Sequence, residues 1–234
     1  SNINKLDLLC FQDSSGSIDL SISGGTPPYQ YQWSNNDTIE DLNNLMADNY
    51  SVLVYDANGC FLNDSTIVSE PALLSLSINS SNVSSCIGQD GTIDLTVNGG
   101  TGSYNYSWSN NENTEDLDSL QAGTYSVIIS DLNNCTIADS IIINDFQSTL
   151  SIDSMNTPSI NGYNIPCNGD TSGYINTFVS GNNGTLEYNW SNGDSIANLS
   201  DLSAGQYILT IIDSLECTAI DSITLTEPLS LFSI

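Results

Sequence analysis

The sequence predicts an all-β fold built from three small antiparallel sandwich units in tandem. One spacing of cysteine, tryptophan and tyrosine occurs three times along the 234 residues. Hydrophobic residues alternate with polar ones over short stretches, which is the period of a β-strand. Turn sequences rich in Gly, Asn and Pro separate these stretches. A recurring unit of this kind indicates a repeat protein.

The repeat is defined by fixed distances around its tryptophan. Each tryptophan lies 22 or 23 residues after one cysteine and 27 before another, and a tyrosine follows it by 17. The period is therefore 75 to 82 residues. The tryptophans are Trp33, Trp108 and Trp190, and the tyrosines are Tyr50, Tyr125 and Tyr207. We predict repeats over 1–71, 72–146 and 147–228, with 229–234 as a strand of a following repeat or the closing strand of the third.

The first repeat shows the expected elements in order. "SIDLSIS" places Ile18, Leu20 and Ile22 on one face of a strand, and the aromatic residues of "YQYQW" alternate in the same way. "IEDLNNL" follows, with Leu42 and Leu45 three residues apart, which is compatible with a short helical turn or a bent strand. "NYSVLVYDANGC" then predicts a hairpin, because "DANG" is a turn sequence.

The residue pattern favours an immunoglobulin-like sandwich. Each unit has room for five to seven short strands, a tryptophan near its middle and a tyrosine at the start of a late strand. That tyrosine, Tyr50 in the first unit, is compatible with a tyrosine corner and equally with an ordinary core residue. Units of this size bury a small core, so a covalent cross-link would stabilise them.

Charge excludes several classes of partner. The chain has 28 acidic residues, one basic residue, Lys5, and no histidine, which gives a net charge of −27. Such a chain repels phosphate backbones and anionic lipids, so we expect neither nucleic-acid binding nor direct membrane insertion. It contains no apolar run of membrane-spanning length. With 39% hydrophobic residues in ordered alternation, it is expected to fold.

The six cysteines predict disulfides. There is no histidine and no C-x-x-C pair for zinc, and no basic neighbour to activate a thiol. Each unit holds two cysteines 49 or 50 residues apart, so we expect one disulfide within each unit. Disulfides in turn indicate a location outside the cytoplasm. The predicted pairs are Cys10–Cys60, Cys86–Cys135 and Cys167–Cys217.

Acidic residues recur in register in two places. Oxygen ligands without histidine or cysteine suit calcium. A disulfide within each unit would bring the two groups to the same end of the sandwich. The alternative is that they are turn-forming and solvating carboxylates. One group is Asp13, Asp90 and Asp170, and the other is Asp56, Asp131 and Asp213.

Catalysis is not expected, because the chain has no base for a nucleophile and spreads its acids evenly. Two aromatic residues of the third unit, Tyr174 and Phe178, fall on the strand face opposite the hydrophobic stripe. They are candidates for stacking on a sugar or on a neighbouring unit, or they are ordinary surface aromatics.

Four stretches resemble a known family. "DSSGSIDLSISGGTPPYQYQWSN", "TIEDLNNL", "YSVLVYDANGC" and "STIVSEP" are similar to the SprB repeat, which occurs in tandem in giant surface adhesins of gliding Bacteroidetes. The third unit departs from this pattern at "GNNGTLEYNW" and "DSLEC". The resemblance implies export by type IX secretion and a place in a cell-surface filament that contacts the substratum. It supplies no catalytic residues.

These observations together predict a non-enzymatic segment of a large extracellular repeat adhesin on the bacterial surface. It would act as a stalk and adhesive surface in attachment and gliding motility. Its partners would be neighbouring repeats of the same chain and the substratum or a surface polysaccharide. The alternatives are a carbohydrate-binding repeat module and a structural linker array that calcium makes rigid.

Overall fold

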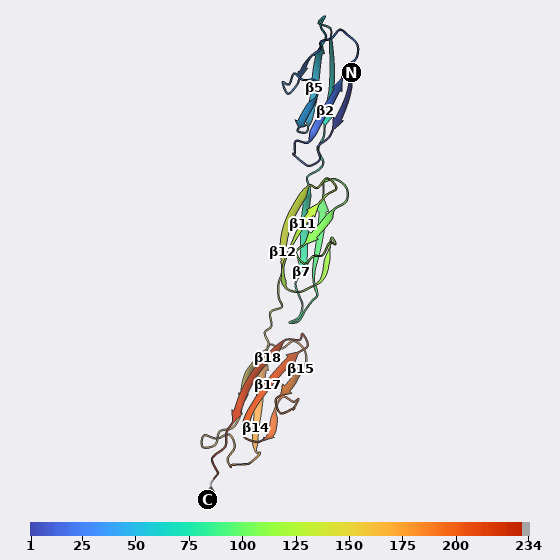
Figure 1. Ribbon diagram of the computed structural model, residues 1–234. Helices are drawn as coiled ribbons and strands as arrows, with labels where there is room; N and C mark the ends of the chain where they lie inside the picture. The colour runs from blue at the N-terminus through green and yellow to red at the C-terminus, as the bar shows by residue number, and fades with distance from the viewer. Residues whose placement is uncertain (231–234) are drawn as a thin grey trace. The chain divides into compact units, whose positions relative to one another are not determined.

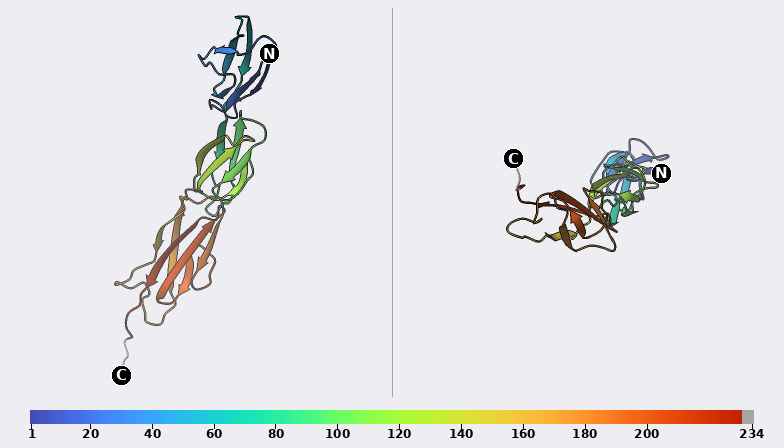
Figure 2. Two further views of the ribbon diagram at one scale, coloured as in Figure 1. Left: turned by 45° about the horizontal axis from the view of Figure 1, so that its top comes forward. Right: turned by 90° about the horizontal axis from the view of Figure 1, so that it is seen from below.

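The computed structural model describes residues 1–230, and these form eighteen β-strands and no helix (Figure 1; Figure 2). The strands make six three-stranded sheets. The all-β prediction is therefore confirmed for the described residues. Because no helix is present among them, none is long and apolar enough to cross a membrane.

The six sheets form three pairs with the same strand order, which we call the first, second and third sandwich. The first pairs sheet β1-β2-β4 with sheet β3-β5-β6, and its strands are Asn2–Leu6, Gly16–Ser21, Gln30–Trp33, Leu42–Leu45, Asp48–Tyr55 and Phe61–Val68. The second pairs β7-β8-β10 with β9-β11-β12, and its strands are Ser75–Ser81, Gly91–Asn98, Asn105–Trp108, Leu117–Leu120, Gly123–Ser130 and Thr136–Ile143. The third pairs β13-β14-β16 with β15-β17-β18, and its strands are Ser151–Asn156, Gly173–Ser180, Leu186–Trp190, Leu199–Leu202, Gly205–Asp213 and Thr218–Leu225.

This strand order is that of an immunoglobulin sandwich with one edge strand missing. Taken in chain order, the strands of the first sandwich correspond to A, B, C, E, F and G, so one sheet is A-B-E and the other is C-F-G. The segment 34–41 connects the two sheets without forming strand D. The tryptophan of each sandwich ends strand C, the position of the buried tryptophan in that fold.

The core of the first sandwich lies between its two sheets. Ile18 and Leu20 of β2 pack with Trp33 of β3 and with Val52 and Val54 of β5, and all five are buried. The predicted alternation of β2 is thereby confirmed. The indole N–H of the tryptophan donates to a backbone carbonyl six residues later in every sandwich, at 2.9 Å, so burying it leaves no unpaired donor. The three pairs are Trp33 with Ile39, Trp108 with Thr114 and Trp190 with Ile196.

The "IEDLNNL" stretch is a bent strand, which settles the alternative left open by its leucine spacing. Leu42 and Leu45 are both buried although they are three residues apart, because Asn44 between them has a φ of 55°. A residue in that left-handed conformation turns the next side chain back to the core, as in a β-bulge. Ser119 and Asp201 repeat this conformation in β10 and β16.

The tyrosine at the start of the late strand forms a tyrosine corner. The hydroxyl of Tyr50 donates to the carbonyl of Met46 at 3.0 Å, and that of Tyr207 donates to the carbonyl of Ser203 at 3.0 Å. A bond from this tyrosine to the backbone a few residues upstream defines that motif.

The chain divides into two compact units. The first consists of residues 1–80, 93–117 and 124–142, and the second of 81–92, 118–123 and the chain from 143. The predicted repeat boundaries at 71/72 and 146/147 fall between strands and stay predictions. Of the predicted strand at 229–234, residues 229 and 230 are not in a strand, and 231–234 lie outside the described residues.

Candidate functional site

The disulfides join neighbouring sandwiches, so the predicted pairing within each repeat is wrong for this structure. Cys10 of the first sandwich is bonded to Cys135 of the second, with a Cα–Cα distance of 5.7 Å. Cys86 of the second is bonded to Cys217 of the third, with a Cα–Cα distance of 5.0 Å. The first bond lies inside the first compact unit and the second bond inside the second.

Strand topology explains why the predicted pairs do not form. Cys10 lies in the β1–β2 loop, where the N–H of Gln12 donates to the Glu70 carboxylate just beyond the last residue of β6. Cys60 lies just before the first residue of β6. Eight extended residues span about 24 Å, whereas a disulfide needs Cα atoms within about 7 Å. The two cysteines of one sandwich are therefore at opposite ends of it.

We call the cysteine of the first loop the loop cysteine and the cysteine of the late hairpin the turn cysteine. The loop cysteines are Cys10, Cys86 and Cys167, and the turn cysteines are Cys60, Cys135 and Cys217. Both disulfides connect a loop cysteine to the turn cysteine of the next sandwich. Cys60 and Cys167 are free and exposed.

Further contacts accompany the disulfide in the first compact unit. The side-chain amide of Asn133 donates to the carbonyl of Leu9 at 2.9 Å, next to the bonded pair. A cavity of about 330 Å³ adjoins the bond. Its lining residues are Cys10, Phe11, 71–74, Gly100, Asp131 and 135–137.

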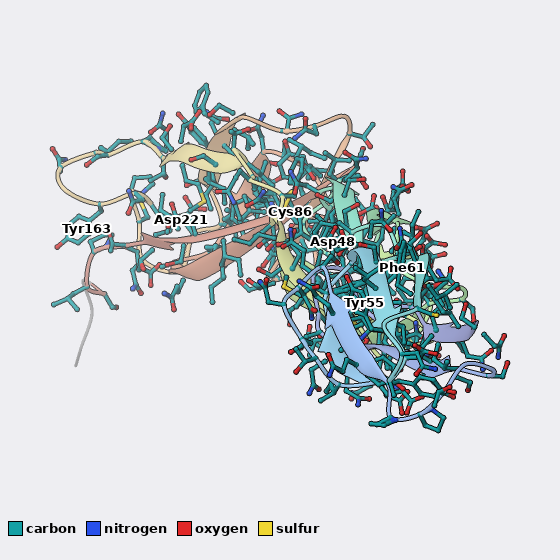
Figure 3. All side chains as sticks on the ribbon, turned by 90° about the horizontal axis from the view of Figure 1, so that it is seen from above. Asp48, Tyr55, Phe61, Cys86, Tyr163 and Asp221 are labelled. Atoms are coloured by element: carbon teal, nitrogen blue, oxygen red, sulfur yellow. A yellow bond between two sulfur atoms is a disulfide. The ribbon has the colours of Figure 1, made fainter. Side chains whose placement is uncertain are left out.

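The second compact unit has a direct backbone contact at its disulfide. The N–H of Cys86 donates to the carbonyl of Leu215 at 3.0 Å, two residues before Cys217. Cys217 itself is buried. Cys86 is labelled in Figure 3, where sulfur is yellow.

The turn that presents the turn cysteine is held by an aspartate. One carboxylate oxygen of Asp131 accepts the N–H groups of Asn133 and Cys135, both at 2.9 Å, and the other accepts the N–H of Thr101 at 2.8 Å. Asp56 and Asp213 make the corresponding bonds in the other sandwiches. In each sandwich, this aspartate holds the turn and its cysteine against the loop between the second and third strands.

These bonds lower carboxyl pKa values. For Asp56, burial opposes ionisation, but the backbone N–H groups of Thr26, Cys60 and Asn58 outweigh it and hold the pKa below its usual value. The N–H of Asn183, followed by that of Cys217, lowers the pKa of Asp213 against burial.

The other aspartates of the calcium hypothesis are bonded inside the first loop. Asp13 accepts the N–H of Ser15 and of Cys10, and Asp90 accepts the hydroxyl and the N–H of Ser84; these hydrogen bonds lower the pKa of both carboxyls. Asp170 accepts the N–H of Thr171 and the hydroxyl of Ser172.

These residues do not fit a calcium site. Asp13 and Asp56 lie at opposite ends of one sandwich, as Cys10 and Cys60 do, so the expectation that they come together is wrong. Residues 1–230 contain no group of three or more His, Cys, Asp or Glu side chains that could hold a metal ion. Their oxygens accept protein donors instead, so we assign them to the turns and derive no metal chemistry from them.

The two candidate aromatics lie on β14 with their rings exposed. Tyr174 is 42% and Phe178 is 53% exposed, while Ile175 between them is buried. No ring contact is found for them within the described residues. An aromatic pair that the sequence reasoning missed is Tyr55 and Phe61, which face each other across the late hairpin with ring centroids 6.2 Å apart (Figure 3).

Comparison with family models finds the SprB repeat at residues 2–38 and 77–113. The two matched segments together cover about a third of the chain. Each match runs from the first strand of a sandwich, through the loop cysteine and the tryptophan, into the turn that follows. A search of curated proteins gives no match.

A search of solved structures matches several chains of low sequence identity. The eight N-terminal Ig domains of Down Syndrome Cell Adhesion Molecule are 13% identical, with 92% of this chain and 34% of that chain covered and a TM-score of 0.42. This chain thus spans about a third of that structure. A Ca²⁺-stabilised adhesin with which an Antarctic bacterium binds ice is 11% identical, covering 97% and 73%, with a TM-score of 0.36. Extracellular domains 3–5 of Drosophila OTK are 10% identical, covering 97% and 92%, with a TM-score of 0.25.

Proposed function

We propose that this chain is a load-bearing spacer of an extracellular adhesin, in which disulfides tie each SprB-type sandwich to the next. The observation that carries the proposal is the direction of the two disulfides, each from a loop cysteine to the turn cysteine of the next sandwich. Covalent bonds of this kind transmit tension between modules without relying on the small cores of the modules themselves.

The two bonds overlap in sequence, which limits how far the chain extends under force. Cys86 lies before Cys135, so the shortest covalent path from Cys10 to Cys217 crosses one disulfide, runs back over the 49 residues between Cys135 and Cys86, and crosses the other. Fully extended, that path is about 170 Å long. Without disulfides, the 207 residues from Cys10 to Cys217 extend to about 720 Å.

Single-molecule pulling from the two chain ends tests the proposal. We expect the extension at full unfolding to rise by about 550 Å when a reductant is added, the difference between the two path lengths. A variant with Cys10, Cys86, Cys135 and Cys217 all changed to Ser is the matched control and should give the long extension without reductant. Equal extension of the native chain with and without reductant would refute the load-bearing path.

The family match and the disulfides support a proposal for the cellular setting. Stable disulfides form in oxidising environments, which supports an extracellular location. We propose that the chain serves surface attachment and gliding motility on a bacterium of the Bacteroidetes after type IX secretion. Its partners would then be neighbouring repeats and the substratum or a surface polysaccharide, and it would have no catalytic activity. The net charge of −27 keeps such a protein soluble and resists self-association.

Carbohydrate binding is a second candidate, favoured by Tyr174 and Phe178. They are four residues apart on one strand face, so their rings are spaced by about 13 Å on an exposed surface. Exposed aromatic rings of this kind offer large apolar faces on which a sugar ring could pack. Binding to a glycan panel that is lost in Tyr174→Ser/Phe178→Ser would support this function, and a panel without any binder would remove it.

A further inference from the structure

A groove of about 300 Å³ runs along β3, the edge strand of sheet β3-β5-β6 in the first sandwich. This volume is at the lower end of the range of small-molecule sites, which is about 300–1,000 Å³. The lining residues come from β3, from the turn after it and from the end of β5, and they are Gln30, Tyr31, Gln32, Asn36, Thr38 and Tyr55. The groove therefore has room for part of a ligand chain.

The groove lies apart from the disulfide junctions. The residues 75 positions after its lining residues are their counterparts in the second sandwich, and none of these lines the cavity at the Cys10–Cys135 bond. Docking of one sandwich on another, as at that bond, therefore leaves this side of the sandwich open.

The side chains of the groove offer free hydrogen-bonding groups beside an aromatic ring. Gln30 and Gln32 are exposed and lie on the same face of β3, about 7 Å apart along the strand. Each amide supplies a carbonyl acceptor and two N–H donors. Tyr55 lies directly opposite Gln30 in the register of β3 with β5. Among the described residues, no hydrogen bond occupies these three side chains or those of Asn36 and Thr38.

Strand β3 also turns backbone groups toward the groove. The N–H of Ser34 donates to the carbonyl of Ser51 in β5 at 2.8 Å. Because backbone direction alternates along an antiparallel strand, Gln32 also bonds to β5, whereas the N–H and C=O of Tyr31 point to the open edge. Burial, followed by a hydrogen bond to Glu40, raises the pKa of Tyr31 to about 12, so this residue stays neutral.

Charge restricts the class of ligand. The chain has 28 acidic residues and a net charge of −27, yet no Asp or Glu lines the groove. The strand registers also put only uncharged residues on the outer face that carries Gln32 and Tyr55. A cationic ligand would find no carboxylate here, and the charge of the whole chain repels an anionic one. Uncharged donors and acceptors beside a ring instead match a neutral ligand rich in hydroxyl groups, which is the chemistry of a sugar.

An added β-strand fits this edge less well than a sugar does. Peptide segments that extend a sheet gain their affinity from a row of backbone hydrogen bonds. Strand β3 has only four residues, and the N–H of Trp33 on its open edge already donates to the carbonyl of Asp37 at 2.9 Å. The carbonyl of Trp33 in turn accepts the N–H of Asn36 at 3.0 Å. Tyr31 alone then presents backbone groups along this edge, which is too few for an added strand.

We propose that the groove along β3 binds a neutral polysaccharide. Hydroxyl groups of the glycan bond to the amides of Gln30 and Gln32 and to the backbone of Tyr31. One sugar ring packs on Tyr55. The proposal rests on the proposed function for the class of partner, a surface polysaccharide, and gives that partner a binding site. This site is in the first sandwich, whereas the exposed aromatic pair of β14 belongs to the third.

Comparison of the three sandwiches separates the ligand-binding side chains from those that packing requires. Tyr31, which packs against the core, recurs as Tyr106 and Tyr188. Three groove residues of the first sandwich do not recur, namely Gln30, Gln32 and Tyr55. Their counterparts are Asn105, Ser107 and Ser130 in the second sandwich and Glu187, Asn189 and Ile212 in the third. The same sheet forms with each set, so the fold does not require the glutamines or the second tyrosine.

Affinity electrophoresis in gels that contain a soluble polysaccharide tests the site. The neutral probes are dextran, laminarin, galactomannan and arabinan, and polygalacturonate is the anionic counterpart. We expect at least one neutral polysaccharide to retard the native chain and polygalacturonate to have no effect. The triple variant Gln30→Asn/Gln32→Ser/Tyr55→Ser should lose affinity by about tenfold or more, which corresponds to about 1.4 kcal/mol. Its melting temperature should match that of the native chain, because the second sandwich folds with these residues.

Two matched variants serve as controls. Ser65→Ala changes the same outer face outside the groove and should bind as the native chain does. Tyr174→Ser/Phe178→Ser removes the exposed aromatics of the third sandwich and should also bind normally.

Three results would overturn the proposal. These are retardation by none of the neutral polysaccharides, equal retardation of the native chain and the triple variant, and loss of binding only in Tyr174→Ser/Phe178→Ser. A dimer of the native chain that dissociates in the triple variant, seen by sedimentation without glycan, would make the face a contact between copies and would also overturn it. Pulling with and without reductant tests the load-bearing path separately, so failure of the groove leaves the proposed function standing.

Discussion

At the scale of single residues, the recurring aspartates accept backbone N–H groups in turns and loops. The sequence had left calcium binding and turn formation with solvation as alternatives for them. Asp56, Asp131 and Asp213 each hold a turn cysteine by accepting backbone N–H groups, and Asp13 does the same for a loop cysteine. For Asp13, Asp56 and Asp213 these hydrogen bonds favour the charged form and hold the pKa below its usual value. These four acids therefore hold turns and loops that carry cysteines, whether the cysteine is bonded or free.

These carboxylates predict a loss of stability in acid. The pKa values of Asp13, Asp56, Asp90 and Asp213 are lower in the folded chain than their usual value of 3.8, so the unfolded chain binds their protons first. Their contribution is complete above about pH 4 and is lost as the pH falls through the folded pKa values. We expect Asp213→Asn to lower the melting temperature at pH 7 and to differ less from the native chain near pH 3. Asp118→Asn, at an exposed position, is the control. An effect of Asp213→Asn that does not change with pH would show that the ionised carboxylate of Asp213 does not stabilise the fold.

At the scale of elements, close approach of strands decides which residues fit. A Cβ on Gly16, at the start of β2, would lie 2.8 Å from the carbonyl oxygen of Leu45 in β4 and 2.8 Å from a methyl of Val68 in β6. Gly91 and Gly173 meet corresponding atoms in the other sandwiches. The glycine thus allows the two sheets of each sandwich to meet at this end.

Gly16→Ala is expected to destabilise the first sandwich. The added methyl cannot avoid a backbone oxygen, and such overpacking costs about 1–3 kcal/mol. Chemical denaturation monitored by tryptophan fluorescence measures the change, with Ser17→Ala on the neighbouring position as the control. A loss smaller than that caused by Ser17→Ala would show that the strands have room to separate.

At the scale of the whole molecule, the overlap of the two disulfides predicts a graded response to force. Breaking Cys86–Cys217 alone leaves a path over the 82 residues from Cys135 to Cys217, about 290 Å long. Breaking Cys10–Cys135 alone leaves the 76 residues from Cys10 to Cys86, about 270 Å long. We expect the corresponding double Cys→Ser variants to extend in pulling experiments between the fully bonded and fully reduced chains. If loss of either bond alone gave the full extension of the reduced chain, the overlapping path would be contradicted.

The sequence by itself determined the strands and the core, because these depend on local periodicity. Alternation at Ile18 and Leu20, the position of Trp33 and the turn at Asp56 follow from side-chain period and turn chemistry, and the structure agrees with them. The nearly equal cysteine spacing in each repeat, however, fits disulfides within a repeat and disulfides between repeats equally well. Only the tertiary structure decided between them, because strand order places Cys10 and Cys60 at opposite ends of one sandwich and beyond the reach of a disulfide.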